Sequence, residues 1–95
     1  MAIELEASRL MVRHGAHCIT NKDPNYTMYC AMAKKYATDK CFHIVNDCLQ
    51  MHGGYGYLQD YPIERFLRDL RVHMILEGTN EIMAHIIQRT LLKDD

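Results

Sequence analysis

The sequence lacks any long hydrophobic run, and its acidic and basic residues nearly balance. No apolar stretch approaches the roughly 20 residues that a membrane-spanning helix requires, so no span is predicted. The 12 acidic and 11 basic residues leave a formal charge of -1, which gives no electrostatic support for binding nucleic acid or an anionic membrane. No internal repeat, low-complexity tract or Pro/Ser-rich linker interrupts the chain, and no alternation of apolar and polar residues predicts a strand.

The composition is typical of one small globular domain. The chain has 95 residues, of which 48% are hydrophobic and 24% charged, so disorder is not expected. A chain of this size buries a modest core and is often stabilised by partners. Its first residues, Met-Ala-Ile-Glu-Leu-Glu, are acidic and amphipathic, and we expect neither a secretory signal nor a transit peptide there.

Four cysteines suggest disulfides, but the spacing of three of them argues against this. Cys30, Cys41 and Cys48 share one face of a single expected helix. The same stripe contains Ala33, Ala37, Ile44 and Met51. Cysteines seven or more positions apart on a helix are separated by about 10 Å, which is too far to bridge. We expect buried, reduced side chains in a reducing compartment.

Apolar residues recur every three or four positions, which predicts four helices. The first covers residues 2–19, the second 25–51 and the third 61–72, and the last begins near 79. Pro24 lies in the break before the second helix, and Gly53 and Gly54 are expected to end that helix as a left-handed cap. Asp60 is expected to cap the third helix. The predicted fold class is therefore all-α, an antiparallel up-down bundle of about four helices.

The same periodicity predicts which side chains face the core. They are Ile3, Ala7, Leu10, His14 and Cys18 in the first helix, Ile63, Phe66, Leu67 and Leu70 in the third, and Ile82, Ile86 and Thr90, flanked by Met83, Ile87 and Leu91, in the last. Arg65, Arg68 and Arg71 are expected on a solvated face, paired with Asp60, Asp69 or a neighbouring subunit. Tyr55 and Tyr57 are expected to anchor the glycine turn against the bundle.

Two segments carry the residues most typical of a reaction site. Gln-Met-His-Gly-Gly-Tyr-Gly-Tyr-Leu-Gln-Asp spans 50–60, and Leu-Glu-Gly-Thr-Asn-Glu spans 76–81. The glycines of the first segment permit positive φ and the close approach of a pyrophosphate to backbone amides. In the second, Glu77 stands beside a glycine at an expected helix start. A carboxylate there is either a base beside a bound nucleotide cofactor or a solvated acid favoured by the helix dipole.

The other features also have purely structural explanations. Thr79 is a good helix cap, and the glycines at 53–56 can simply end the helix before them. Six histidines suggest a metal site, and the pairs His14/His17 and Cys48/His52 have helical spacing. Four convergent ligands cannot be assembled from these pairs without assuming the packing, so no metal site is predicted.

Together the motifs resemble the C-terminal helical domain of the acyl-CoA dehydrogenases. The pattern is Gln-x-x-Gly-Gly-x-Gly-Tyr, then Asp60, Arg65 and Asp69, then Glu-Gly-Thr-Asn-Glu-Ile, and the Ala-Met-Ala-Lys run at 31–34 matches the second helix of that domain. The resemblance covers essentially all of the chain. Among members, Gln-Met-His-Gly-Gly-Tyr-Gly-Tyr-Leu and Arg-Val-His-x-Ile-Leu-Glu-Gly-x-Asn-Glu are most similar to the short branched-chain, isobutyryl-CoA type.

This resemblance implies a three-part enzyme in which residues 1–95 form a single C-terminal helical domain, with the N-terminal helical and middle β domains absent. The family oxidises an acyl-CoA to its 2-enoyl-CoA: a base removes the α-proton while the β-hydride moves to FAD. Glu77 matches that base, and in the family its backbone N–H also binds the thioester carbonyl. Gly78 lets the acyl chain pass close to the backbone.

The resemblance also assigns two groups of flavin contacts. Thr79, Asn80 and Glu81 match positions that contact FAD. A second group matches a family segment that reaches the FAD of a neighbouring subunit. It consists of Gln50, Met51, His52, Gly53 and Gly54. The resemblance also implies an acyl-CoA substrate and an electron-transferring flavoprotein as partner. It further implies a homotetramer located in the mitochondrial matrix or in the bacterial cytoplasm. One position departs: Ala84 stands where the family usually has an arginine that helps hold the surroundings of the site.

The isolated chain is expected to be inactive, because the β domain carries much of the flavin contact in the family. The alternative hypothesis is a truncated helical module that associates through its apolar face and has no catalytic activity.

Overall fold

The computed structural model describes residues 1–93 and is all-helical over that range. Its elements are α1 (Ala2–Thr20), α2 (Tyr26–His52), the short 3-10 helix η1 (Gly53–Tyr57), α3 (Ile63–His73) and α4 (Asn80–Leu91). The predicted all-α class with four helices is confirmed, and each predicted boundary lies within two residues of the observed one. Within residues 1–93, no helix combines the length and the hydropathy that crossing a bilayer would require.

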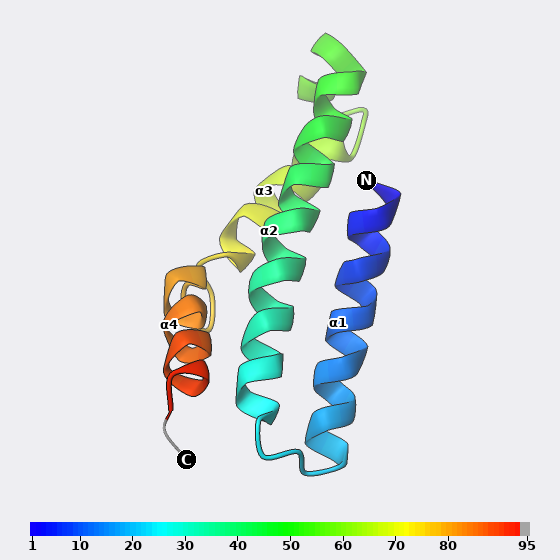
Figure 1. Cartoon of the computed structure of the whole chain (residues 1–95). Coiled ribbons are helices and arrows are strands. Elements are labelled where there is room, and N and C mark those ends of the chain that lie inside the picture. The colour runs from blue at the N-terminus through cyan, green and yellow to red at the C-terminus, as the bar shows by residue number, and fades with distance from the viewer. Residues whose placement is uncertain (94–95) are drawn as a thin grey trace.

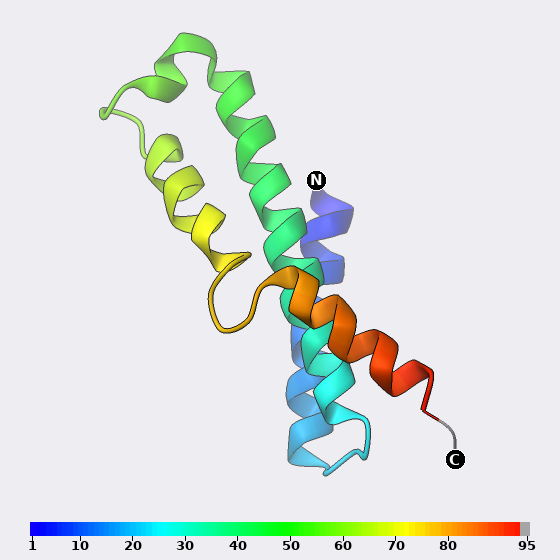
Figure 2. The ribbon, with the colours of Figure 1, turned by 90° about the vertical axis from the view of Figure 1, so that its left-hand side faces the viewer.

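Helix α2 is the centre of the arrangement (Figure 1). Helix α1 runs antiparallel to α2 along one side, and α3 and α4 lie across α2 from α1. Over the described residues, α1 contacts neither α3 nor α4, and α3 does not contact α4. Figure 2 shows α3 running back beside α2 and α4 crossing α2 obliquely. Every contact between two α-helices in the described residues therefore involves α2, and α3 also contacts η1.

The domain is elongated and open. It measures 54 × 22 × 18 Å, and its radius of gyration is 15.8 Å, whereas a compact domain of this length has about 12 Å. Its accessible surface of 7027 Å² exceeds the roughly 5,700 Å² expected for a compact monomer of this mass. Much of the surface that a compact domain would bury is thus left in contact with solvent.

The core is small and lies where α2 meets its neighbours. The buried apolar residues are Cys18, Met28, Ala31, Ala33, Ile63 and Met83. Nineteen large apolar side chains are exposed within the described range. The imbalance follows from the open layer, because each outer helix has only α2 to pack against.

The predicted inward face of α1 is largely wrong. Ile3 is 84% exposed and Leu10 is also exposed, whereas the buried residues of this helix are Ser8, Gly15 and Cys18. Since α1 packs against α2 alone, only a narrow stripe of it is covered, and small residues on that stripe let the two helices approach closely. Of the five residues predicted to face inward, only Cys18 is buried.

Parts of the faces predicted for α3 and α4 are also wrong. Ile63 and Met83 are buried, but Phe66, Ile82 and Leu91 are exposed. The cause is the same, because no other element covers the outer sides of these helices. The two tyrosines expected to anchor the glycine turn, Tyr55 and Tyr57, are exposed as well, the latter by 82%.

The four cysteines are free, in agreement with the prediction. Full burial of the stripe on α2 is wrong, however, because Cys30, Cys41 and Cys48 are only half-buried. Cys18 of α1 is the buried cysteine. Burial raises the pKa of its thiol, and the nearby Asp23 and Cys30 raise that pKa further.

Local chemistry explains the end of α1. The Asp23 N–H donates to the Cys18 carbonyl at 2.9 Å, and the Lys22 N–H donates to the Ile19 carbonyl at 3.2 Å. Lys22 has a φ of 55°. These features define a Schellman motif with a lysine at the left-handed position, where glycine is more usual.

The C-terminus of α2 and the N-terminus of α3, on either side of the glycine turn, differ from the prediction. Gly53 has the expected positive φ of 62°, but its ψ of -141° lies outside the left-handed helical region, and the chain continues into η1. Asp60 does not cap α3. The residue before that helix is Pro62, and no side-chain cap bond is made.

The expected pairing of the α3 arginines is wrong within this chain. Arg68 pairs with Glu64, one turn earlier, at 2.8 Å, and not with Asp60 or Asp69. Asp69 lies 3.9 Å from the His73 ring nitrogen instead. The i, i+4 spacing within the helix decides these partners, and exposed pairs of this kind stabilise a helix by only about 0.5 kcal/mol or less.

Candidate functional site

The two motif segments lie at different levels along α2. Residues 50–54 form the end of α2 and the start of η1, whereas the start of α4 is joined to α2 at Thr38 and Asp39. Asp39 and Gln50 are eleven positions apart, which corresponds to about 16 Å along the helix axis. One chain therefore presents two separate candidate surfaces.

Glu77 lies in the tight turn that connects α3 to α4. Its φ is 56° and that of Gly78 is 90°, so two consecutive residues have positive φ. A side chain in this region costs on the order of 1 kcal/mol, and such strain is concentrated at functional sites. The Glu77 side chain is exposed and makes no hydrogen bond or ion pair with the described residues. Its carboxylate is thus available to a partner outside this chain.

The turn is closed by its own backbone. The Asn80 N–H donates to the Met74 carbonyl at 3.0 Å, which joins the start of α4 to the end of α3. At Gly78 a Cβ would come within 2.9 Å of Met83 Cε, and the positive φ would strain any side chain whatever the space. The turn therefore depends on glycine at this position.

Lys34 of α2 attaches the same turn to α2 through two hydrogen bonds. Its Nζ donates to the Gly78 carbonyl oxygen at 2.8 Å and to Asn80 Oδ1 at 2.6 Å. One ammonium thus bonds both the residue after Glu77 and the first residue of α4.

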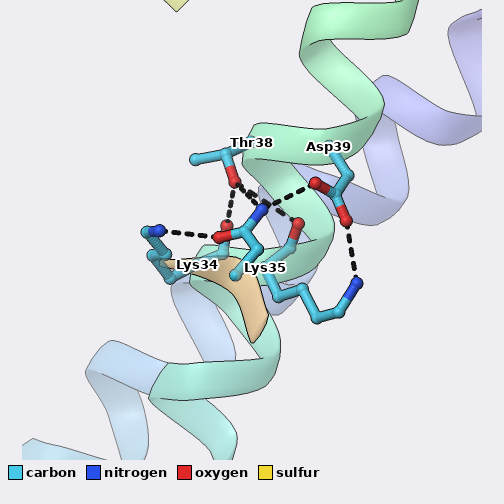
Figure 3. A network of polar contacts seen from close by, with 5 residues as sticks. Lys34, Lys35, Thr38 and Asp39 are labelled. Atoms are coloured by element: carbon cyan, nitrogen blue, oxygen red, sulfur yellow. Dashed lines mark hydrogen bonds and ion pairs between the residues drawn. The ribbon is translucent and has the colours of Figure 1, made fainter. Parts of the chain in front are cut away.

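Asn80 is buried, and its side chain is fully engaged with α2. Its Nδ2 donates to Thr38 Oγ1 at 2.9 Å and to Asp39 Oδ1 at 2.6 Å, while its Oδ1 accepts from Lys34. Figure 3 shows the network, in which Lys34, Lys35, Thr38 and Asp39 follow one another along α2. Both amide protons of Asn80 are used here and its backbone N–H donates to the Met74 carbonyl, so Asn80 offers FAD no unpaired N–H donor. FAD contact by Asn80 stays a prediction.

Asp39 is the acidic member of the network. Its partial burial acts to raise the pKa, but hydrogen bonds from Lys35 and Asn80 act in the opposite direction. The positive charges of Lys35 and His43 add to this, and the net effect is a pKa below the ordinary aspartate value. Lys35 Nζ lies 2.9 Å from Asp39 Oδ2. The carboxylate is therefore ionised at neutral pH and anchors α4 through Asn80.

Thr79 caps α4, which confirms the capping role that its sequence position suggested. Its Oγ1 accepts from the Ile82 N–H at 3.3 Å, and its carbonyl accepts from the Met83 N–H at 3.0 Å. The backbone N–H of Glu81 has no acceptor among the described residues. An unpaired N–H at a helix start is suited to an anionic or carbonyl oxygen.

The three glycines of the distal segment have different surroundings. A Cβ on Gly56 would lie 2.9 Å from the Leu49 carbonyl oxygen and 3.0 Å from Leu49 Cγ, so glycine lets η1 pack on the end of α2. Around Gly53 and Gly54, by contrast, no atom lies within 4 Å of the position a Cβ would take. Their backbone is open to an approaching molecule.

The remaining residues of this segment are exposed as well. Gln50, Met51 and His52 all lie on the surface, and His52 Nδ1 is bonded to the Cys48 carbonyl at 2.7 Å. Accessible glycine backbone and free polar side chains fit the donor set that a flavin nucleotide would require. At the start of α4 the side chains of Thr79 and Asn80 are engaged within the chain, whereas the backbone N–H of Glu81 has no acceptor among the described residues and is free to donate to a flavin nucleotide.

Neither the histidines nor Ala84 adds a further site. Among residues 1–93, no group of three or more His, Cys, Asp or Glu side chains lies close enough to hold a metal ion. Ala84 is exposed on α4 and contributes to a shallow apolar hollow that Lys35, Ile87 and Leu91 also line.

Comparisons with known proteins agree with this fold. The chain matches the family model described as acyl-CoA dehydrogenase, C-terminal domain, over residues 1–92. The chain belongs to the acyl-CoA dehydrogenase family. It is 57% identical over its whole length to mitochondrial isobutyryl-CoA dehydrogenase of Dictyostelium discoideum, and 52% identical over 99% of its length to the Bos taurus protein of that name. The resemblance to the isobutyryl-CoA type is confirmed.

Solved structures give the same result. A chain from a study of the electron transferring flavoprotein of Acidaminococcus fermentans superposes with a TM-score of 0.95 at 41% identity over 99% of this chain and 24% of that one. Butyryl-CoA dehydrogenase from Megasphaera elsdenii has a TM-score of 0.94 at 34% identity, over 98% of this chain and 24% of that one. The chain spans about a quarter of the length of the curated relatives it matches.

The sequence reasoning missed Lys34, Thr38 and Asp39 as part of the site. A signal was present, because a lysine and a threonine four positions apart share one face of a helix that also carries small, buried alanines. Lys34 belongs to the Ala-Met-Ala-Lys run that matches the second helix of the family domain, but this match gives the side chain no role. Only the packing of α4 on α2 shows what these side chains hold.

Proposed function

We propose that this chain is the C-terminal domain of an FAD-dependent acyl-CoA dehydrogenase that converts a short, branched acyl-CoA to its 2-enoyl-CoA. The observation that carries the proposal is the strained, solvent-accessible turn at Glu77 and Gly78, in a chain 57% identical to an isobutyryl-CoA dehydrogenase. The identity to this type of relative supports the branched, short acyl chain as substrate.

In this proposal Glu77 is the base that removes the α-proton of the thioester. Its backbone N–H donates to the thioester carbonyl oxygen and stabilises the negative charge that develops there, and a donor of this kind is worth about 3 kcal/mol. Gly78 leaves room for the acyl chain. FAD, when bound, accepts the hydride from the β-carbon.

The residues that would hold FAD belong to both surfaces. Thr79, Asn80 and Glu81 hold it at the start of α4. The second surface holds the FAD of a neighbouring subunit through Gln50, Met51, His52, Gly53 and Gly54. This arrangement requires a homo-oligomer, and a tetramer is the family's usual form. The distance along α2 between the two surfaces favours this division, since one segment is about 16 Å from the level of the other.

An electron-transferring flavoprotein is the proposed redox partner. A relative from Acetobacterium woodii, 44% identical over 98% of this chain, is named as a subunit of a caffeyl-CoA reductase-Etf complex. The two isobutyryl-CoA relatives are named as mitochondrial. We propose the mitochondrial matrix for a eukaryotic source and the cytoplasm for a bacterial one.

A chimaeric enzyme tests the proposal. The chain replaces the matching 23% of the Dictyostelium relative, and oxidation of isobutyryl-CoA is followed with and without Glu77→Gln. We expect this variant to keep its flavin and to lose at least about 100-fold in turnover. The exposed Glu6→Gln is the matched control and keeps full turnover. Wild-type turnover by the Glu77→Gln chimaera would refute the assignment of the base.

The 95-residue chain alone is proposed to be inactive and to associate with itself. The nineteen large apolar side chains exposed within residues 1–93 favour association as an alternative function for an isolated module. Purified chain with added FAD and isobutyryl-CoA is expected to show no turnover, and sedimentation is expected to show a dimer or tetramer. Measurable turnover would contradict inactivity, and a monomer at high concentration would contradict the association module.

A further inference from the structure

The turn that carries Glu77 has a single side-chain link to α2. Among the described residues, Lys34 Nζ is the only side-chain donor or acceptor of α2 that bonds any residue from 75 to 79, through the Gly78 carbonyl at 2.8 Å. The same Nζ bonds Asn80 Oδ1 at 2.6 Å, so it holds both ends of the tripeptide Gly78-Thr79-Asn80 that follows Glu77.

This link lies where the backbone most needs support. Glu77 has a φ of 56° and Gly78 one of 90°, and a left-handed conformation at a non-glycine residue persists only when its surroundings determine it. The backbone bond from Asn80 N–H to the Met74 carbonyl closes the turn but does not attach it to α2. Lys34 supplies that attachment.

The other end of the link is itself fixed. Asn80 is held on α2 by Thr38 at 2.9 Å and by Asp39 at 2.6 Å. Asp39 is in turn paired with Lys35 at 2.9 Å. The position of the Lys34 ammonium is therefore defined by a rigid helix below it and by two acceptors on the turn above it.

We propose that Lys34 is a positioning residue, whose ammonium holds the Gly78 carbonyl and Asn80 so that the Glu77 carboxylate and backbone N–H are presented to the acyl-CoA thioester in one orientation. The inference rests on the proposed role of Glu77 as the base. Lys34 does not touch the reacting atoms in this scheme. By fixing the turn, Lys34 restricts the Glu77 carboxylate to orientations from which it can reach the α-proton.

Lys34→Met is the appropriate variant, because it keeps an unbranched aliphatic side chain beside α4 and removes the donors. Lys40→Met is the matched control. Lys40 lies on the same helix and is also half-buried, but its Nζ lies over the Tyr36 ring at 5.7 Å and has no contact with the turn.

The first measurement uses the 95-residue chain and does not depend on activity. Amide hydrogen exchange is followed residue by residue in the wild type and in both variants. We expect the Asn80 amide to exchange at least about tenfold faster in Lys34→Met, while amides of α1 and of the facing part of α2 change by less than about twofold. An unchanged Asn80 amide, or equal acceleration throughout the chain, would overturn the proposal, since the second result describes general destabilisation.

The second measurement uses the chimaeric enzyme. We expect Lys34→Met to lower kcat at least about tenfold while KM stays within about twofold and the flavin content is unchanged, and Lys40→Met to change neither constant. If Glu77→Gln abolishes turnover and Lys34→Met retains the wild-type kcat, the positioning role alone is wrong. If Glu77→Gln retains turnover, the proposed function itself fails, and the role of Lys34 fails with it.

Discussion

Asn80 Nδ2 donates a 2.6 Å hydrogen bond to Asp39 Oδ1, which joins the first residue of α4 to the middle of α2 across 41 positions of sequence. Asn80 is buried, whereas the Asp39 side chain is partly buried, with 29% of it exposed. Helix α4 contacts no helix other than α2 over the described residues, so this bond and its neighbours decide where α4 and the preceding turn lie.

Replacing Asp39 by asparagine should destabilise the chain. The substitution replaces two charged acceptor oxygens by a single neutral amide oxygen, so Asn80 and Lys35 can no longer both keep their bonds to residue 39, and we expect a loss of about 1–2 kcal/mol in the free energy of unfolding. Denaturant titration measures the loss. Asp47→Asn, at an exposed position on the same helix, is the control and should change stability by less than about 0.5 kcal/mol. Equal stability of the two variants would mean that the bonds of Asp39 contribute nothing to the free energy of unfolding.

The stability of the chain should also fall in acid because of Asp39. Its folded-state pKa is lower than the ordinary value of 3.8, so the unfolded chain takes up the proton first. The stabilisation is complete above about pH 4 to 5 and is lost as the pH falls below 3.8 through the folded-state pKa. Unfolding curves between pH 6 and pH 2 should show a shallower decline for Asp39→Asn than for the wild type. Parallel declines would show that other carboxylates account for the effect.

Alanine substitutions at two glycines of the distal segment should differ in their effect on stability. Gly56→Ala places a Cβ 2.9 Å from the Leu49 carbonyl oxygen, so η1 has to move and stability falls by about 1–3 kcal/mol. Gly54→Ala meets no atom within 4 Å, and its effect on stability should stay within about 0.5 kcal/mol. Thermal unfolding followed by circular dichroism separates the two outcomes. A neutral Gly56→Ala would mean that η1 is not packed on α2.

The strain at Glu77 can be measured with glycine. Glu77→Gly removes the side chain from a residue with a φ of 56° and should stabilise the isolated chain by about 0.5–1 kcal/mol. Glu81→Gly, within the first turn of α4, should instead destabilise it by up to about 1 kcal/mol, because glycine is unfavourable in a helix. Equilibrium unfolding in urea compares them. Destabilisation by both changes would show that Glu77 is not strained.

Alkylation should distinguish Cys18 from the other cysteines. Its thiol is buried, and burial together with Asp23 and Cys30 raises its pKa, so the reactive thiolate is scarce at neutral pH. We expect iodoacetamide to modify Cys18 last and at least about tenfold more slowly than the half-buried Cys48, with the difference shrinking as the pH rises. Peptide mass spectrometry at timed intervals gives both rates. Modification of Cys18 first would contradict its burial.

The sequence by itself determined the helices and the chemistry of the candidate base. Helix ends depend on local features such as Pro24, Gly53 and the cap at Thr79, and these act over a few residues, so the boundaries were predictable. The pairing of Glu77 with Gly78 was also local, and its motif was sufficient to indicate the family.

The tertiary structure decided which faces are buried and which side chains hold the turn at Glu77, the candidate base. The periodicity of α1 favoured a face containing Ile3 and Leu10, but packing covers Ser8 and Gly15, because α1 meets only α2 and small residues allow that contact. The bonds of Lys34 and Asp39 to the start of α4 join residues more than forty positions apart. No local pattern specifies such a pair, because the choice of helix face depends on the competing contacts of the whole chain, whereas a cap or a turn depends only on its neighbours.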